Sequence, residues 1–147
     1  MSLSFRIIIL VCSVLLIASP LFAGDAVAVG YNSEGIWTGV TYYASSKSKG
    51  GKDHKTEKEA GDEAVRDLQK RSANKAARVE ILSSSDSTGF VAVARGKEKS
   101  GKELNVVGRG QSKVAADQDA FARLTEAGAS VKQKIVYRYF SYGSDAK

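Results

Sequence analysis

The chain has 147 residues, a formal net charge of +6, one cysteine and one histidine. One cysteine cannot form an internal disulfide, and one histidine without thiolate partners cannot form a structural zinc site. After removal of a leader, the length suits a single domain that is held together by its core and not by disulfides.

The first 23 residues have the plan of a secretory signal peptide. Arg6 is the only charged residue, the apolar run IIILVCSVLLIA follows it, and Pro20 and Ala23 supply a break and a small residue for cleavage. The run is shorter than the ~20 apolar residues that span a membrane. We therefore expect a periplasmic or secreted protein, cleaved near Ala23 or, as a second choice, after Ala26, without a stable membrane anchor. An uncleaved N-terminal anchor is the alternative.

A β-hairpin is expected over Ala26–Tyr43. Val27 and Val29 alternate with small residues before the turn Asn32–Gly35, and β-branched and aromatic residues alternate with others after it. A period of two on both sides of a polar, glycine-containing turn is typical of antiparallel strands joined by a hairpin.

A helix and a third strand follow this hairpin. Thr56 and Glu59 form a capping box, in which a hydroxyl and a carboxylate satisfy backbone amides at a helix start. Small residues and one leucine recur at spacing four, joined by Val65, and predict the buried stripe of the helix: Ala60, Ala64 and Leu68. Ala77–Leu82 then predicts a strand.

The same order of elements recurs between residues 89 and 142. A hairpin over Gly89–Gly110 has a lysine-rich loop that we expect to be longer than the first, and Lys134–Tyr142 predicts the last strand. Between them a second helix begins at Ser112, and its stripe matches the first at an offset of 56 residues: Ala116, Ala120, Phe121 and Leu124. At the same offset Val79 matches Ile135 and Ile81 matches Tyr137, so the two third strands are expected to share phase.

Two ββαβ repeats, about 26–82 and 89–142, are therefore expected within residues 24–147. One unit alone leaves the apolar face of its sheet uncovered, whereas two units complete one core by merging their sheets or by packing face to face. The predicted fold is a pseudo-symmetric α+β domain with a mainly antiparallel sheet and two helices.

The motifs AVAVG, GIWTG, TEKEAGDEAVRDL and ARVEIL follow one another and recur in weaker form. This series resembles a family of small secreted bacterial proteins of unknown function, whose members carry a G-x-W-G hairpin, an AEAEAxAL helix and an apolar strand, each twice. Trp37-Thr38-Gly39 matches the hairpin motif, whereas the second copy has Val106-Val107-Gly108, and the cysteines that are usual in the family are missing. The resemblance implies an α+β fold and an extracytoplasmic location, and it carries over no catalytic residues.

Signatures of catalysis are missing from the sequence. His54 is the only histidine and lies in a polar, lysine-rich segment, and neither a G-x-S-x-G elbow nor a phosphate-binding loop occurs. The carboxylate pairs fall on the surfaces of the predicted helices, where little acts to shift their pKa values. We therefore predict a non-enzymatic binding or structural protein with no cofactor and no metal.

Two groups of basic residues are candidates for binding an anion. The leading group lies in the second hairpin and at the start of the second helix: Arg95, Lys97, Lys99, Lys102, Arg109 and Lys113. The secondary group precedes the first helix: Lys47, Lys49, Lys52 and Lys55. We expect the leading group to matter more, because no glutamate competes for the amide groups at the start of its helix. The alternative is that these residues only keep the chain soluble and protect sheet edges.

Four aromatic residues are candidates for an exposed surface that contacts a protein or a glycan: Trp37, Tyr43, Phe140 and Tyr142. Cross-strand pairing that only stabilises the sheet is the alternative. The predicted partner is a polyanionic component of the cell envelope or an unknown protein, and no nucleic acid is expected. A rival hypothesis is an inhibitor or immunity-type protein that blocks an envelope enzyme through aromatic and basic surface residues.

Overall fold

The structure, a computed structural model, describes residues 24–43, 57–71, 76–85 and 87–143. The first half consists of β1 (Asp25–Tyr31), β2 (Trp37–Tyr43), α1 (Glu57–Arg71) and β3 (Arg78–Ser85). The second half consists of β4 (Gly89–Lys97), β5 (Glu103–Gly110), α2 (Lys113–Glu126) and β6 (Val131–Ser141). The predicted order of elements is confirmed, and β3 and β6 extend a few residues beyond their predicted bounds. The predicted signal peptide, the capping residue Thr56 and the secondary lysine group lie outside the described residues.

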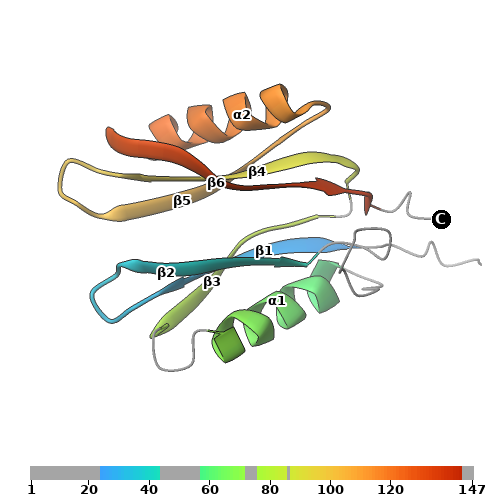
Figure 1. The fold of residues 1–147 in the computed structure, drawn as a ribbon, viewed down its shortest axis with the longest axis horizontal. Coiled ribbons are helices and arrows are strands. Elements are labelled where there is room, and N and C mark those ends of the chain that lie inside the picture. Colours follow the sequence, from blue (N-terminus) through green and yellow to red (C-terminus); the bar gives the residue numbers. More distant parts are fainter. Residues whose placement is uncertain (1–23, 44–56, 72–75, 86, 144–147) are drawn as a thin grey trace, which may run out of the picture.

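Each half forms its own three-stranded antiparallel sheet, in the order β2-β1-β3 or β5-β4-β6. The first strand of each half is therefore central in its sheet. The two sheets face one another, and α1 and α2 cover their outer faces, so the molecule has four layers (Figure 1). This arrangement confirms the predicted α+β class with two helices, and it shows that the sheets pack face to face without merging.

Stripes of small residues let each helix lie close to its sheet. Six of the residues predicted for these stripes are buried: Ala60, Ala64, Leu68, Ala116, Ala120 and Leu124. Val65 and Phe121, which were predicted to join them, are partly buried. The Ser112 side chain accepts a hydrogen bond from the Ala115 amide at 3.1 Å and caps α2. At Gly108 of β5, an added Cβ atom would lie 2.2 Å from the backbone nitrogen of Ala120. Glycine is therefore required where α2 crosses β5.

Both hairpins close through connections of five residues, Asn32–Ile36 and Glu98–Lys102. In each connection, the amide of the first residue donates to the carbonyl of the fifth, and the fourth residue, a glycine, donates to the carbonyl of the first. Gly35 and Gly101 have φ angles of 76° and 90°, which glycine adopts without strain. The expectation of a longer second loop is wrong, because the pairing of β4 with β5 extends into the segment that was predicted as loop.

The third strands share phase over only part of their length. Val79 and Ile135, which match at an offset of 56 residues, both pack under the helix of their own half. Ile81 pairs with Ala28 on the side of the sheet that α1 covers. Tyr137 pairs with Val93 and packs in the layer between the sheets. The expected match at an offset of 56 residues fails here because the two strand pairings have bulges at different positions, and a shift of one residue turns a side chain to the other face.

Valines from both halves form the core between the sheets. The buried members come from three strands: Val27, Val91, Val93 and Val107. Tyr42 of β2 packs against this valine layer, and its ring centroid lies 4.4 Å from that of Tyr139 and 4.7 Å from that of Tyr137, both on β6. Apolar and aromatic side chains thus join the two sheets over their central part.

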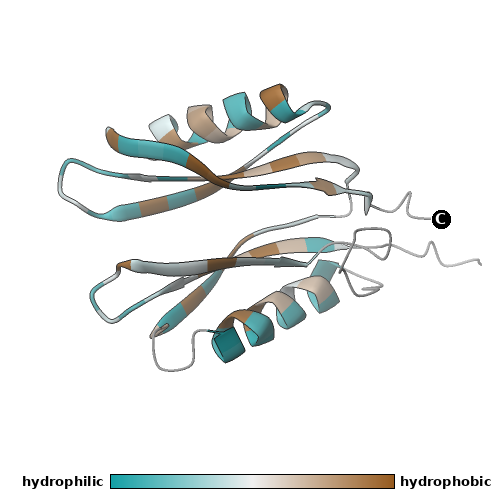
Figure 2. Cartoon of the chain, viewed as in Figure 1, coloured by the Kyte–Doolittle hydropathy of each residue, from teal (hydrophilic) through white to brown (hydrophobic). Residues whose placement is uncertain are grey.

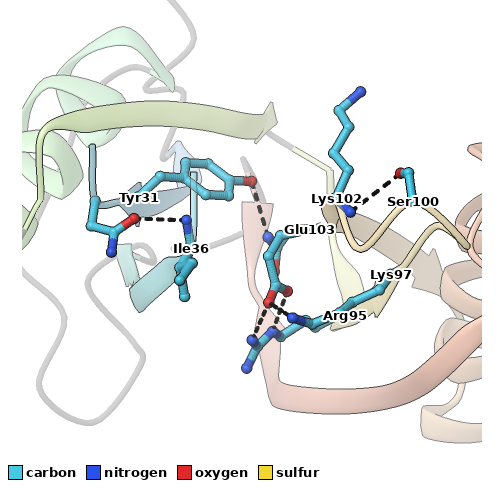
Figure 3. Close-up of polar contacts among 9 residues, drawn as sticks. Tyr31, Ile36, Arg95, Lys97, Ser100, Lys102 and Glu103 are labelled. Atoms are coloured by element: carbon cyan, nitrogen blue, oxygen red, sulfur yellow. Dashed lines mark hydrogen bonds and ion pairs between the residues drawn. The ribbon is translucent and has the colours of Figure 1, made fainter. Parts of the chain in front are cut away.

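Polar contacts join the sheets at both ends of the valine layer. At one end, Arg109 donates to both carboxylate oxygens of the fully buried Asp25, at 3.1 and 3.3 Å. Tyr139 donates its hydroxyl proton to the same carboxylate. Burial and the neighbouring Asp25 charge raise the pKa of Tyr139 well above its usual range, so this hydroxyl keeps its proton. At the other end, the Asn105 amide donates to the Tyr31 hydroxyl at 2.9 Å (Figure 3).

Gly108→Ala should destabilise the protein strongly. The added methyl group would meet backbone atoms of α2 at 2.2 to 2.6 Å, and backbone cannot move aside as a side chain can. We expect the free energy of unfolding to fall by roughly 3 kcal/mol or more. Gly39→Ala is the matched control: its nearest neighbour is the Leu68 side chain at 3.6 Å, so the change should stay within about 1 kcal/mol. Equal effects of the two substitutions in urea unfolding would contradict this packing.

Candidate anion-binding site

A cation-rich hollow of about 490 Å³ lies where the end of β4 meets the start of β6. We refer to the six residues that line it as the basic pocket: Arg95, Gly96, Lys97, Lys132, Gln133 and Lys134. Four of the six carry a positive charge. In Figure 2, β6 is hydrophobic at its first tip and hydrophilic just after it, and residues 132–134 are exposed, so a dissolved anion has access to the basic pocket.

A bulge in β6 shapes the basic pocket. Arg95 of β4 pairs with Lys134 of β6. Lys97, two residues after Arg95, pairs with Val131, which is three residues before Lys134. Two steps along β4 thus correspond to three steps along β6, so β6 has one extra residue here. Lys132 lies in this bulge with a φ of 55°, the one positive φ of a residue other than glycine in the described parts of the chain. Such a backbone costs a non-glycine residue roughly 1–2 kcal/mol, and bulges often re-aim side chains beside functional sites.

Glu103 of β5 holds two of the four cations. Arg95 donates from Nε and Nη2 to the two carboxylate oxygens at 2.8 and 2.7 Å, and the Lys97 ammonium lies 2.8 Å from Oε1 (Figure 3). The Glu103 side chain is only 2% exposed. Hydrogen bonds from Arg95 outweigh the effect of burial and lower the pKa of Glu103 from 4.5 to about 2. Glu103 is therefore ionised at neutral pH.

Trp37 of the opposite sheet contacts the other side of Arg95. The guanidinium carbon lies 4.6 Å from the centroid of the Trp37 ring, which is a cation–π contact. The carboxylate of Glu103 thus occupies one edge of the planar guanidinium group, and the indole ring covers its face. Arg95 contributes its charge to the basic pocket, but this edge is not available to a ligand.

Lys132 and Lys134 have no carboxylate partner in the part of the chain that the structure describes. Glu103 offsets one of the four positive charges, which leaves an excess of three in the basic pocket. Two unit charges about 4 Å apart interact by roughly 1 kcal/mol even in water. Several cations around one hollow therefore attract an anion more strongly than separate lysines do, and the arrangement suits reversible binding.

The structure brings two members of the leading basic group into the basic pocket, Arg95 and Lys97. Lys99 and Lys102 lie in the turn between β4 and β5, and the Lys102 ammonium is 3.4 Å from a carboxylate oxygen of Glu98. Arg109 is bound to Asp25 at the other end of the valine layer. The predicted group is thus spread over both ends of the second sheet.

Lys113 lies in a second hollow, of about 540 Å³, between the start of α2 and the end of β6. Asp117 and Arg138 also line this hollow and bind each other through two hydrogen bonds of 2.7 and 2.8 Å. Phe140 is a further lining residue, and its ring packs edge-on against that of Phe90 at 4.9 Å. With two cations and one carboxylate, this hollow has a smaller excess of positive charge than the basic pocket.

The aromatic residues that were predicted for an exposed surface are partly buried, and each contacts other side chains. Trp37 lies against Arg95 between the sheets, whereas Tyr43 packs against the core under α1. The Phe140 ring contacts the rings of Phe90 and Tyr142 at 4.9 and 5.0 Å. The structure therefore does not bring the four predicted residues together.

Sequence reasoning missed Lys132, Lys134 and Glu103. The two lysines stand in VKQKIVY, a stretch in which no local signal marks the bulge that brings both beside Arg95. Glu103 lies in the lysine-rich stretch GKEKSGKE, where a carboxylate is usually solvated. One signal was present in the sequence. Two basic residues separated by one other residue occur in the segment 95–97 and again in the segment 132–134, and pairing of these two strands places like charges side by side.

Within the described ranges, no group of three His, Cys, Asp or Glu side chains is placed to hold a metal ion, and no helix is both long and apolar enough to cross a membrane. Comparisons with known proteins find no matching family model, no matching curated protein and no matching solved structure. The resemblance to the secreted bacterial family stays a prediction, and an inference about function rests on the geometry of the basic pocket.

Glu103→Gln should lower the stability of the protein and change its sensitivity to acid. At pH 7, Arg95 and Lys97 would face a neutral amide, and we expect the free energy of unfolding to fall by roughly 1–3 kcal/mol. In the wild type, the lowered pKa of Glu103 contributes stability that is complete above pH 4.5 and is lost as the pH falls towards about 2. The variant should lack this part of the pH dependence.

Glu98→Gln is the matched control, because the Glu98 contact with Lys102 lies in an exposed turn. Exposed pairs contribute about 0–1 kcal/mol, so this variant should behave like the wild type in urea unfolding at each pH. Equal stability of the Glu103 variant and the wild type at pH 7 would show that the carboxylate does not hold the two cations.

Proposed function

We propose that this chain is an exported, non-enzymatic protein that binds an anionic component of the cell envelope through the basic pocket. The observation that carries the proposal is the β6 bulge, which adds Lys132 and Lys134 to Arg95 and Lys97 around one hollow. Among the described residues, Glu103 is the one carboxylate that contacts these cations. An anion in the hollow therefore interacts with several positive charges at once.

Solubility alone explains the basic pocket less well. Lysines that keep a protein soluble need no neighbours of like charge, whereas like charges on paired strands lower stability. Protection of a sheet edge accounts for lysines on the edge strand β6. It does not account for Arg95 and Lys97 on the central strand β4, nor for Lys132 in left-handed backbone. A bound anion offsets the repulsion among all of these groups.

The N-terminal sequence pattern supports export, and the burial of Asp25 favours one of the two cleavage positions. Cleavage after Ala23 leaves Asp25 in place, whereas cleavage three residues later removes it together with its bonds to Arg109 and Tyr139. We therefore expect the exported protein to begin at Gly24. N-terminal sequencing of the secreted or periplasmic fraction checks this, and a chain that begins three residues later or keeps its leader would contradict it.

An inhibitor or immunity-type protein is less well supported. Interfaces of such proteins depend on exposed anchors, most often Trp, Tyr or Arg. Trp37 and Arg95 contact each other here, and Phe140 contacts two neighbouring rings. Charge, more than exposed aromatic surface, distinguishes the described part of this molecule.

Reversal of the charges of Lys132 and Lys134 should weaken the binding of polyanions. The variant Lys132→Glu/Lys134→Glu is compared with Lys99→Glu/Lys113→Glu, which changes the net charge by the same amount outside the basic pocket. At low salt, we expect the pocket variant to lose at least about tenfold in affinity for lipopolysaccharide, lipoteichoic acid or polygalacturonate, and the control less than about threefold. Wild-type binding should also weaken with added salt, because screening at physiological ionic strength acts over ~8 Å.

Equal losses in the two variants would indicate diffuse attraction by a basic protein and would count against the basic pocket. Lys47→Glu/Lys49→Glu is a third comparison with the same change in charge, and its effect should also be small. If the wild type binds none of the three polyanions at low salt, the proposed function is wrong.

A further inference from the structure

We infer that the group accepted by the basic pocket is a phosphate monoester, bound in preference to a carboxylate or a sulfate. The inference rests on the proposed function and adds the chemistry of the ligand to it. It follows from two features of the basic pocket: which of its donors are already occupied, and how much positive charge remains.

The guanidinium group of the basic pocket is already engaged. Arg95 directs Nε and Nη2 to Glu103 at 2.8 and 2.7 Å, and Trp37 covers its face. Such a planar fork binds a carboxylate or a phosphate through two parallel N–H···O bonds. Since Glu103 occupies the Nε–Nη2 edge, a ligand does not gain that bidentate contact there and depends on the lysines of the basic pocket.

Apart from the second edge of Arg95, the charged donors that remain are ammonium groups. Lys132 and Lys134 have no partner among the described residues, and Lys97 directs one contact to Glu103. An ammonium is a compact charge with three donors and no preferred plane. A phosphate monoester has three terminal oxygens and a charge of about −1.5 to −2 at neutral pH, so it interacts with several ammonium groups at once.

The excess of positive charge favours the more highly charged of two ligands that have the same shape. A sulfate monoester also has three terminal oxygens, but it carries a single negative charge. The energy of the ligand in the field of the basic pocket is proportional to the ligand's charge. Charge therefore separates phosphate from sulfate, and it also separates phosphate from a carboxylate, which carries a single negative charge and two oxygens.

The titration of the ligand gives the inference a specific signature. The ionisable groups that face the basic pocket come from β4, β6 and β5: Arg95, Lys97, Lys132, Lys134 and Glu103. With its pKa lowered to about 2, Glu103 does not change its charge near neutral pH. The second ionisation of a phosphate monoester lies near about pH 6. Binding of the phosphate should therefore strengthen as the pH rises through this value, while binding of the sulfate stays constant.

Isothermal titration calorimetry with small probes tests this inference. Glucose 6-phosphate, glucose 6-sulfate and glucuronate are compared with the full mature protein at low salt, at about pH 5 and about pH 7.5, on either side of the second ionisation. We expect the affinity for glucose 6-phosphate to rise at least about threefold between these pH values and to exceed that for the other two probes at the higher pH. The affinity for glucose 6-sulfate should not change.

Two variants show which group produces the effect. Lys132→Gln should weaken the binding of glucose 6-phosphate, whereas Lys99→Gln, the matched control from the exposed turn, should not. The one histidine of the chain, His54, lies outside the described residues. His54→Gln should keep the full pH dependence, because the titrating group belongs to the ligand.

Soluble sugars and lipid headgroups both carry phosphate monoesters, and vesicles distinguish these sources. Phosphatidylcholine vesicles are prepared with phosphatidic acid, a monoester, or with phosphatidylglycerol, a diester with one charge. Sedimentation with the phosphatidic acid vesicles alone would support the inference with a lipid headgroup as the source. Binding of glucose 6-phosphate without sedimentation would support it with a soluble source.

Three results with the small probes, the histidine variant and the vesicles would overturn the inference and leave the proposed function standing. They are equal affinity for the phosphate and the sulfate, a pH dependence that His54→Gln abolishes, and equal sedimentation with both kinds of vesicle. Binding of large polyanions without measurable binding of any phosphate monoester would also overturn it. If neither polyanions nor small probes bind, the proposed function fails together with the inference.

Discussion

Face-to-face packing of the two sheets is the constraint on which the rest of the structure depends. A helix covers the outer face of each sheet, and the inner face is covered by the other sheet, so each half needs its partner. Valines of the central strands fill the layer between them. Asp25 with Arg109 closes one end of this layer, and Tyr31 with Asn105 closes the other. These polar pairs fix how one sheet is placed on the other. A shift of the sheets would leave buried polar groups without partners, and the stability lost in this way exceeds the stability that the pairs add.

The basic pocket is a consequence of how this layer ends. Arg95 continues the inner face of β4 beyond the valines, between Trp37 of the opposite sheet and Glu103 of the neighbouring strand. A largely buried arginine needs a partner, and Glu103 provides one. One carboxylate does not neutralise all the cations that β4 and β6 bring to this end. The remaining charge, which includes Lys132 and Lys134, is the basis of the proposed function.

Much of the fold follows from local patterns, and the candidate site does not. Alternation along the hairpins and alanines at spacing four in the helices depend on nearby residues, so the sequence predicts these elements well. The choice between merged and stacked sheets depends on contacts between distant residues, as do the bulges. Arg95 and Lys97 are prominent because basic residues cluster around them. Lys132 and Lys134 look like ordinary strand residues until β6 is paired with β4. The pairing of β5 with β4 then shows that Glu103 is a buried partner and not a solvated charge.

The position at which an anion binds is the most direct test of the basic pocket. A titration of the ¹⁵N-labelled protein with inorganic phosphate at low salt, followed by two-dimensional NMR, reports on each backbone amide separately. We expect shift changes that saturate together and are concentrated at residues 95–97, 103 and 131–134, with the amides of Arg109 and Lys113 unchanged. Changes centred on Lys99 or Lys113, or spread evenly over all basic residues, would contradict the basic pocket as the binding site.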